Sequence, residues 1–349
     1  MKTTYYICAT PYHIIAASTL ACGNFKDSQA KLLVMPHFVL SEEMIETLRQ
    51  SGIYSSVEVY NYSNKSKLQN LKRLFNAFIP DRKIFKIAHD KNTERVVFFA
   101  LDFIDAAYLV KKGCEVVFGD DGIGAYINGN CYKPRPRPVK VLKMKHQLEL
   151  LEKITKLYVY KPDYVLSNRH LDLVEIQQSP DITTRITELV SKLWPVEDVE
   201  ISNSILYFEQ PREDNSASLI KELKYVDKAK EVSGKDIYVK MHPRSTYRAR
   251  YQQKYQVLDT NAPFEAMILQ DKTKFDLMMT FTSTAIFVPF LINNSYSHYT
   301  KAILMQTIVD GARGISFEQL VDKIKENNPE CEIYFPKDEE EFNEILKNV

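Results

Sequence analysis

Residues 114–122, Cys-Glu-Val-Val-Phe-Gly-Asp-Asp-Gly, join an apolar strand pattern to a polar turn. The run Cys114–Phe118 is short and β-branched, which is typical of a buried strand. The turn that follows is rich in glycine and carries two neighbouring carboxylates. Open α/β sheets bind ligands at the carboxyl ends of their strands, where this turn falls. The stretch therefore predicts an α/β fold with a polar site directly after one strand.

The two carboxylates of this turn, Asp120 and Asp121, are candidate catalytic residues. Adjacent like charges disfavour the ionisation of both groups, so one acid is suited to act as a general base on a sugar hydroxyl. Gly122 follows the pair, and glycine allows positive φ and close approach of a ligand to the backbone. The alternative interpretation is an ordinary Asp-Gly turn with no chemical role.

Strand and helix patterns alternate on both sides of this stretch, which predicts parallel sheets with helices on both faces. The other predicted strands cover residues 5–9, 31–35, 57–60, 95–99, 163–166, 204–208, 237–241, 257–258 and 275–281. The predicted helices cover residues 12–22, 65–86, 102–112, 217–232, 263–269 and 342–349, with further helices beginning at Ser41 and Thr282. Residues 179–202 are weakly patterned and are interpreted as a connection. We expect two Rossmann-like domains, residues 1–180 and 200–349, whose sheets face a central cleft.

Composition excludes several classes of protein. A net charge of +1 argues against a nucleic-acid binder, and no apolar run approaches the roughly 20 residues of a membrane span. The first eleven residues lack the pattern of a signal peptide, which predicts a cytoplasmic protein. Five cysteines without CxxC spacing predict reduced thiols, and seven histidines without HxxxH spacing predict no metal site. The chain also lacks the GxGxxG, GxxxxGK[ST] and GxSxG motifs.

A second candidate site is Lys-Met-His-Pro-Arg, residues 240–244, at the end of a predicted strand. Pro243 restricts the backbone after His242, while Lys240 and Arg244 add positive charge. A histidine in such a setting is suited to assist a leaving phosphate. The alternative interpretation is a surface histidine in a basic turn.

Two further motifs lie at predicted helix starts. In Thr-Phe-Thr-Ser-Thr-Ala, residues 280–285, Ser283 and Thr284 are placed to bind phosphate together with free backbone N–H groups. In Pro-Phe-Glu, residues 263–265, Glu265 is placed to accept hydrogen bonds from ribose hydroxyls. The alternatives are a plain N-cap for the first motif and a helix-dipole partner for the second.

Weaker signals concern the acceptor and a membrane. His13 follows the first predicted strand in Thr-Pro-Tyr-His, residues 10–13, and is a candidate acceptor contact or a packing residue. Residues 133–161 are strongly basic around an apolar stripe, as is the 65–86 segment. Such segments suit a solvated helix or peripheral contact with an anionic membrane. Arg135 and Arg137, between prolines, are alternatively suited to an anionic oligosaccharide.

The ordered set of Thr-Pro-Tyr-His, Asp-Asp-Gly, His-Pro, Pro-x-Glu and Ser-Thr resembles the bacterial sialyltransferases that decorate lipooligosaccharides and capsules. The resemblance spans roughly residues 5 to 290. It implies a GT-B-like fold and an inverting, metal-independent reaction in which CMP-sialic acid is the donor and no cofactor is needed. It assigns the base to Asp120 or Asp121, although related families differ over which acid acts and whether the base comes from this loop at all.

In the same resemblance, the remaining motifs bind the donor. His242 assists the departing phosphate, Glu265 contacts the nucleotide, and Ser283 and Thr284 bind the phosphate, although two serines are the common pair in that motif. Gly122, Pro243 and Arg244 complete the expected donor site.

The expected function is sialyl transfer to a galactose-terminated glycan in capsule or lipooligosaccharide synthesis. The alternatives are a polysialyltransferase, another GT-B glycosyltransferase, and a non-catalytic binding module attached to a membrane through its basic helices. The sequence also leaves a homodimer as an alternative to a monomer.

Overall fold

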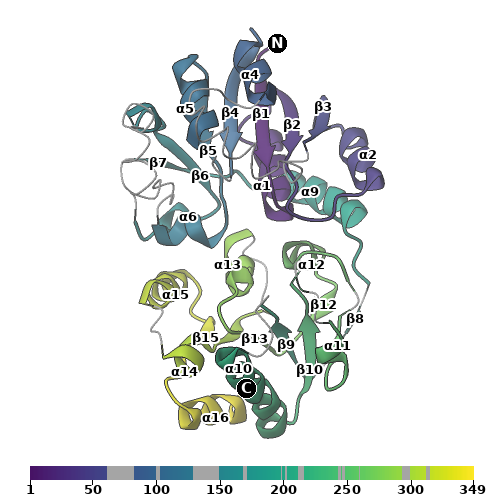
Figure 1. Cartoon of the computed structure of the whole chain (residues 1–349), viewed down its shortest axis with the longest axis vertical. Helices are drawn as coiled ribbons and strands as arrows, with labels where there is room; N and C mark the ends of the chain where they lie inside the picture. The colour runs from purple at the N-terminus through teal and green to yellow at the C-terminus, as the bar shows by residue number, and fades with distance from the viewer. Residues whose placement is uncertain are drawn as a thin grey trace. The chain divides into compact units, whose positions relative to one another are not determined.

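Two separate parallel sheets organise the chain in the computed structural model (Figure 1). The structure describes residues 1–60, 82–99, 103–128, 149–167, 171–197, 199–200, 203–210, 216–242, 245, 248–258, 260–292, 299–311 and 315–349. The chain divides into two units, Met1–Leu193 and Trp194–Val349. Each unit contains one large sheet. The predicted class of two α/β units with parallel sheets is thus confirmed.

The sheet of unit 1 has the strand order β3-β2-β1-β4-β5-β6-β7, and every pairing in it is parallel. Its strands are β1 Thr3–Cys8, β2 Gln29–Val34, β3 Ser56–Val59, β4 Thr93–Phe98, β5 Glu115–Phe118, β6 Lys156–Val159 and β7 Asp172–Glu175. The chain builds outward from β1 in one direction and then returns to its other side with β4. The carboxyl ends of β1 and β4 therefore form the switch point at which such sheets bind ligands.

Helices cover both faces of this sheet. Both faces need cover, because successive side chains of a strand point to opposite faces. They are α1 Pro11–Cys22, α2 Glu42–Gln50, α4 Arg82–His89, α5 Phe103–Lys111, α6 Ile123–Asn128 and α9 Pro180–Leu193, with a 3₁₀ turn η2 Pro162–Tyr164. Tyr6 contacts Tyr54, whose hydroxyl is hydrogen-bonded to Ser18 of α1. The neighbouring Tyr5 instead lines a pocket together with residues of α4. The helix predicted from Ser41 is confirmed, since Ser41 accepts a hydrogen bond from the Met44 N–H.

The larger sheet of unit 2 has the order β11-β10-β9-β13-β14-β15, again fully parallel. Its strands are β9 Ser204–Phe208, β10 Asp236–Lys240, β11 Gln256–Val257, β13 Leu277–Thr280, β14 Lys301–Leu304 and β15 Glu332–Tyr334. A second, two-stranded sheet pairs β8 Val199–Glu200 with β12 Thr273–Lys274. The helical elements are α10 Ala217–Ser233, α11 Arg248–Gln252, α12 Phe264–Gln270, η3 Thr284–Phe287, α13 Val288–Ile292, α14 Gln306–Asp310, α15 Ile315–Asn327 and α16 Glu339–Lys347. Strand residues such as Tyr207 and Met279 form one buried cluster with Val226 of α10 and Phe342 of α16.

Some sequence predictions were wrong. Residues 163–166 are not a strand: η2 lies there, and the last strands of unit 1 are β6 and β7. A short apolar run such as Tyr164-Val-Leu166 does not distinguish a strand from a buried turn. Residues 179–202, expected to form only a connection, contain α9, which packs against α1 and α2. Strands β14 and β15 and helices α14 and α15 were not predicted.

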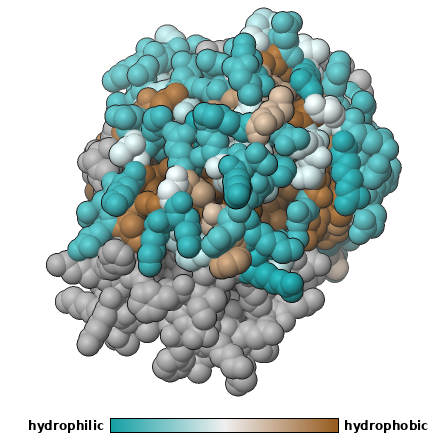
Figure 2. Space-filling model, turned by 90° about the horizontal axis from the view of Figure 1, so that it is seen from above, coloured by the Kyte–Doolittle hydropathy of each residue, from teal (hydrophilic) through white to brown (hydrophobic). Residues whose placement is uncertain are grey.

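The hydropathy of the surface, the character of the helices and the state of the cysteines bear on the expectations from composition. Figure 2 shows one face on which hydrophilic side chains predominate and hydrophobic side chains form small patches. Within the described part of the chain, no helix has both the length and the apolar character that crossing a membrane requires. Cys8, Cys22, Cys114 and Cys331 are free thiols, and Cys131 lies outside the described residues.

Candidate active site

Three neighbouring strands of unit 1 deliver polar or aromatic residues to one edge of the sheet. The chain leaves β5 at Phe118 and passes through the Asp-Asp-Gly turn into α6. It leaves β1 at Cys8 and enters α1, whose first turn carries His13. Phe99 directly follows β4. Because β1, β4 and β5 are adjacent and parallel, these residues meet at the switch point.

Asp120 is fully buried and anchors the turn. Its Oδ1 accepts a hydrogen bond from the Gly122 N–H at 2.8 Å. Its Oδ2 accepts from the Tyr126 hydroxyl and from the Tyr160 N–H. Burial raises the pKa of Asp120 to about 6, and these hydrogen bonds oppose that rise by stabilising the charged form. Gly122 has a φ of +79°, so the turn uses the conformational freedom of glycine here.

Asp121 is partly exposed, whereas Asp120 is fully buried. Its side chain is 33% exposed, and its Oδ1 lies 2.7 Å from the Nε2 of His13. The Nδ1 of His13 accepts a hydrogen bond from the Ala9 N–H at 3.1 Å, so Nδ1 carries a lone pair. Nε2 therefore carries the proton and donates it to Asp121. The imidazole thus fixes the orientation of a carboxylate that reaches the surface.

The histidine itself is buried. Its side chain is 3% exposed and its ring stacks on Phe99 with ring centroids 5.4 Å apart. Gly119 makes this packing possible, because a Cβ at that position would come within 2.3 Å of the Phe99 ring. The structure thus places His13 behind Asp121 rather than at the surface.

In unit 2, residues from adjacent strands again gather at the carboxyl edge. Lys240 ends β10 and is buried, which lowers the pKa of its ammonium to about 8, while the charge of Glu265 opposes that change. Glu265 lies in the first turn of α12, whose N-cap is Pro263. Burial raises the pKa of the Glu265 carboxyl, and the charge of Lys240 lowers it. His242 follows two residues after the strand and is partly buried.

The hydroxyl motif follows β13, the strand on the other side of β9. The Ser283 N–H donates to the Thr280 Oγ1 at 3.0 Å, and the Ser283 Oγ accepts from the Ala285 N–H at 3.3 Å. Ser283 is therefore the N-cap of η3, and Thr284 is its exposed first residue. A capping role does not prevent the hydroxyl from contacting a ligand as well.

Several site residues escaped the sequence analysis. Glu209, at the end of β9, is 3% exposed and binds the segment that contains His242. Tyr126, Tyr160 and Phe99 surround the acidic turn and its histidine. The available signal for Glu209 was an acid that directly follows the apolar run Ile205–Phe208. Nothing in the sequence connects the two tyrosines to Asp120.

Four predicted contact residues lie outside the described residues: Pro243, Arg244, Arg135 and Arg137. The same holds for most of the two basic segments, 133–161 and 65–86. Among the described residues, no three His, Cys, Asp or Glu side chains are grouped as a metal site would require.

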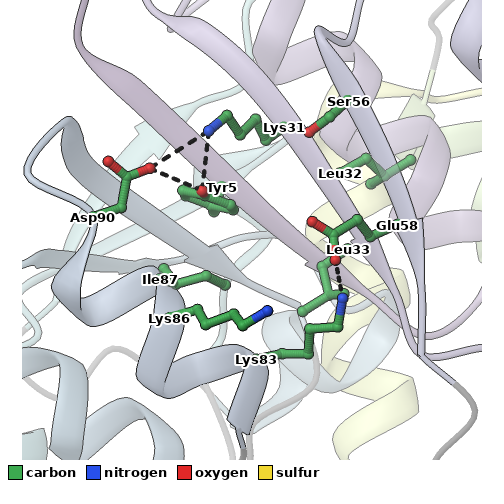
Figure 3. Close-up of a pocket in the computed structure, with 10 residues that line it drawn as sticks. All are labelled: Tyr5, Lys31, Leu32, Leu33, Ser56, Glu58, Lys83, Lys86, Ile87 and Asp90. Atoms are coloured by element: carbon green, nitrogen blue, oxygen red, sulfur yellow. Dashed lines mark hydrogen bonds and ion pairs between the residues drawn. The ribbon is translucent and has the colours of Figure 1, made fainter.

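A polar pocket of about 230 Å³ lies on the α4 face of unit 1 (Figure 3). It is lined by Tyr5, Lys31, Leu32, Leu33, Ser56, Glu58, Lys83, Lys86, Ile87 and Asp90. Many of its polar groups pair with one another: the Tyr5 hydroxyl donates to Asp90 at 3.1 Å, Lys31 lies 3.4 Å from Asp90, and Lys83 pairs with Glu58. None of the predicted site residues lines this pocket.

Comparison with known proteins gives one family match. The family model described as alpha-2,8-polysialyltransferase (POLYST) matches residues 6–301. No curated protein sequence matches the chain.

Solved structures show the same fold at low identity. An alpha/beta-galactoside alpha-2,3-sialyltransferase from Photobacterium phosphoreum is 14% identical, with 96% of this chain and 98% of the other covered and a TM-score of 0.52. The GT-B domain of a Photobacterium damselae sialyltransferase is 12% identical, with 96% and 100% covered and a TM-score of 0.50. A UDP-GlcNAc 2-epimerase from Methanocaldococcus jannaschii is 14% identical, with 100% and 93% covered and a TM-score of 0.57. These likenesses show a GT-B fold, which confirms the predicted fold class.

Proposed function

Because the chain belongs to the alpha-2,8-polysialyltransferase family, we propose that it transfers sialic acid from CMP-sialic acid to a glycan that already ends in sialic acid. The family description supports the α-2,8 linkage. The order of the acceptors expected from the sequence, galactose first and polysialic acid second, is thereby reversed. CMP-sialic acid as the donor and inversion at the anomeric carbon rest on the sequence resemblance.

One contact carries the catalytic part of the proposal, the 2.7 Å hydrogen bond between His13 and Asp121. A sugar hydroxyl is a poor nucleophile and needs a base within hydrogen-bond reach. Asp121 is the better candidate of the two acids, because it is partly exposed, while Asp120 is fully buried and accepts three hydrogen bonds. His13 fixes the orientation of the Asp121 carboxylate through this hydrogen bond.

The donor is assigned to unit 2. Lys240 supplies buried positive charge, and His242 and Ser283 supply donors for a phosphate. Glu265 is assigned to the ribose hydroxyls. Burial raises the pKa of its carboxyl, and hydrogen bonds donated by a ribose would stabilise the charged form.

In the proposed step, the acceptor hydroxyl gives its proton to Asp121 while its oxygen attacks the anomeric carbon of the sialyl group. The bond from that carbon to the phosphate oxygen of CMP breaks at the same time. CMP leaves with the bonding electron pair, and its negative charge is met by His242 and the cationic surroundings. The sialyl centre passes through an oxocarbenium-like state, as other glycosyl centres do.

The test is a transfer assay with CMP-sialic acid and two acceptors, one ending in sialic acid and one of the lactose type. We expect mass spectrometry to show a ladder of products on the sialylated acceptor, each heavier by one sialic acid, and NMR to show α-2,8 linkages. An Asp121→Asn variant, which keeps the size of the side chain without its basicity, serves as the inactive control.

Three results would contradict this proposal. Transfer to the lactose-type acceptor alone would favour a galactoside sialyltransferase. Turnover of a uridine nucleotide sugar in place of CMP-sialic acid would favour another GT-B transferase. Saturable CMP binding without turnover of any donor would favour the non-catalytic module.

A further inference from the structure

Glu209 lies at the centre of the proposed donor site although no motif pointed to it. It directly follows β9, the strand between β10 and β13. Its backbone N–H donates to the Lys240 carbonyl at 3.1 Å. The pairing of β9 with β10 therefore continues past the last register pair, Phe208 with Lys240.

Beyond the end of the backbone pairing, the side chain of Glu209 binds the residues that follow β10. Its Oε2 accepts a hydrogen bond from the His242 N–H at 2.9 Å. Its Oε1 accepts from the Ser245 Oγ, also at 2.9 Å. The Ser245 N–H in turn donates to the His242 carbonyl at 2.8 Å, which closes a four-residue turn. One carboxylate thus binds both ends of the turn that begins with His242.

Burying the Glu209 carboxylate costs free energy unless its hydrogen bonds to His242 and Ser245 compensate. Burial raises the pKa of Glu209, while the bonds from His242 and Ser245 and the charge of Arg250 oppose that rise. The backbone hydrogen bond between Ser245 and His242 is enough to close this turn. The two hydrogen bonds to Glu209 therefore constrain the direction in which the turn leaves β10. Glu209 is 3% exposed, which leaves it little surface with which to touch a substrate.

We propose that Glu209 is a positioning residue: it fixes the direction in which the chain leaves β10 and thereby aims the His242 imidazole at the donor. This inference rests on the proposed donor role of His242. It assigns Glu209 a geometric task, in which its two hydrogen bonds matter and its negative charge does not.

The two roles, geometry and charge, are separated by a pair of variants. Glutamine at position 209 can accept from the His242 N–H with its carbonyl and donate to the Ser245 hydroxyl with its amide. Glu209→Gln should therefore keep kcat/KM within about threefold of the wild type, while Glu209→Ala should lower it about tenfold or more. If the alanine variant fails to fold, Ser245→Ala removes one of the two contacts and should show a smaller loss.

A double-mutant cycle shows whether Glu209 acts through His242. In a His242→Ala background, Glu209→Ala should cost less than about twofold, because its target is already absent. An equal loss in both backgrounds would overturn the proposal and leave only a general structural role. A loss in Glu209→Gln as large as in Glu209→Ala would overturn it as well, in favour of a charge effect.

A spectroscopic test works even if the protein transfers no sialic acid. The ring signals of His242, identified by comparison with His242→Ala, are recorded by NMR on the histidine-labelled protein without ligand. We expect them to shift or broaden in Glu209→Ala and to match the wild type in Glu209→Gln. Unchanged signals in the alanine variant would refute the positioning role independently of the reaction.

Discussion

The turn after β5 in unit 1 and the turn after β10 in unit 2 are held by the same device from different directions. In each, a buried carboxylate accepts hydrogen bonds from the backbone and from a side-chain hydroxyl. In unit 1 the anchor Asp120 belongs to the turn itself, and its neighbour Asp121 is partly exposed. In unit 2 the anchor Glu209 comes from the adjacent strand β9, and the neighbouring group is His242.

Burial distinguishes the roles of acidic residues at the end of a strand. Residue type and sequence spacing make Asp120 and Asp121 look equivalent, yet burial separates them into an anchor and an accessible group. Glu209 shows the converse, because an acid that belongs to no motif binds the backbone of His242, which does belong to one.

The largest effect is expected from Asp121→Ala. If Asp121 is the base, the turnover rate should fall at least about a hundredfold while CMP affinity changes little, since a base acts on the acceptor proton. Steady-state kinetics and calorimetric titration with CMP check both quantities. Near-normal turnover would remove Asp121 from the mechanism.

Asp120→Asn should alter the pH dependence of stability. The pKa of Asp120 is raised from 3.8 to about 6, so the folded state binds the proton more tightly than the unfolded state. Its contribution to the free energy of unfolding is fully present below pH 4 and is lost as the pH rises through 6, by about 3 kcal/mol. Urea unfolding at several pH values should show the variant gaining on the wild type by that amount between pH 4 and 7. Parallel curves for the two proteins would contradict the prediction.

Ser283→Ala should weaken CMP binding by about 1 kcal/mol if its hydroxyl contacts the phosphate. Loss of the cap on η3 predicts a similar loss of stability, so thermal unfolding is measured on the same sample. Thr284→Ala helps to separate the two effects, because Thr284 is also expected to bind the phosphate but does not cap η3. A stability loss with unchanged CMP affinity would leave Ser283 with a capping role alone.

No effect is expected from chelation. Fixed positive charge at Lys240 is proposed to meet the phosphate, so transfer should continue in excess EDTA. If activity disappears and magnesium or manganese restores it, Asp121 becomes a candidate ligand and the proposed mechanism fails.

Much of the fold could be predicted from local patterns. Strands β1, β5, β9 and β10 were placed within about two residues, because each is a buried apolar run bounded by polar residues. Strand β15 has only three residues, Glu332–Tyr334, and carries too little pattern to be found. Helix α9 is not predicted, because Pro180 in a weakly patterned segment indicates a break, whereas in the structure it is the first residue of the helix.

The site was only partly predictable for a different reason. The acidic turn and the His-Pro turn were visible as motifs, since their residues are adjacent in sequence. The contacts that sort them are not adjacent: Asp121 meets His13, Asp120 meets Tyr160, and His242 meets Glu209. Those pairings depend on which strands become neighbours, and a single sequence without known strand order does not give that information.

The strand order also constrains how the protein folds. In each large sheet the first strand, β1 or β9, lies in the interior, between the next strand of that sheet and one that comes much later in the chain. β1 cannot complete its pairing until β4 is synthesised, and β9 must wait for β13. Such non-local pairings slow folding and leave apolar strands exposed in the meantime. During synthesis, Tyr6-Ile-Cys8 and Ile205–Phe208 are therefore the segments for which we expect chaperones to have the longest access.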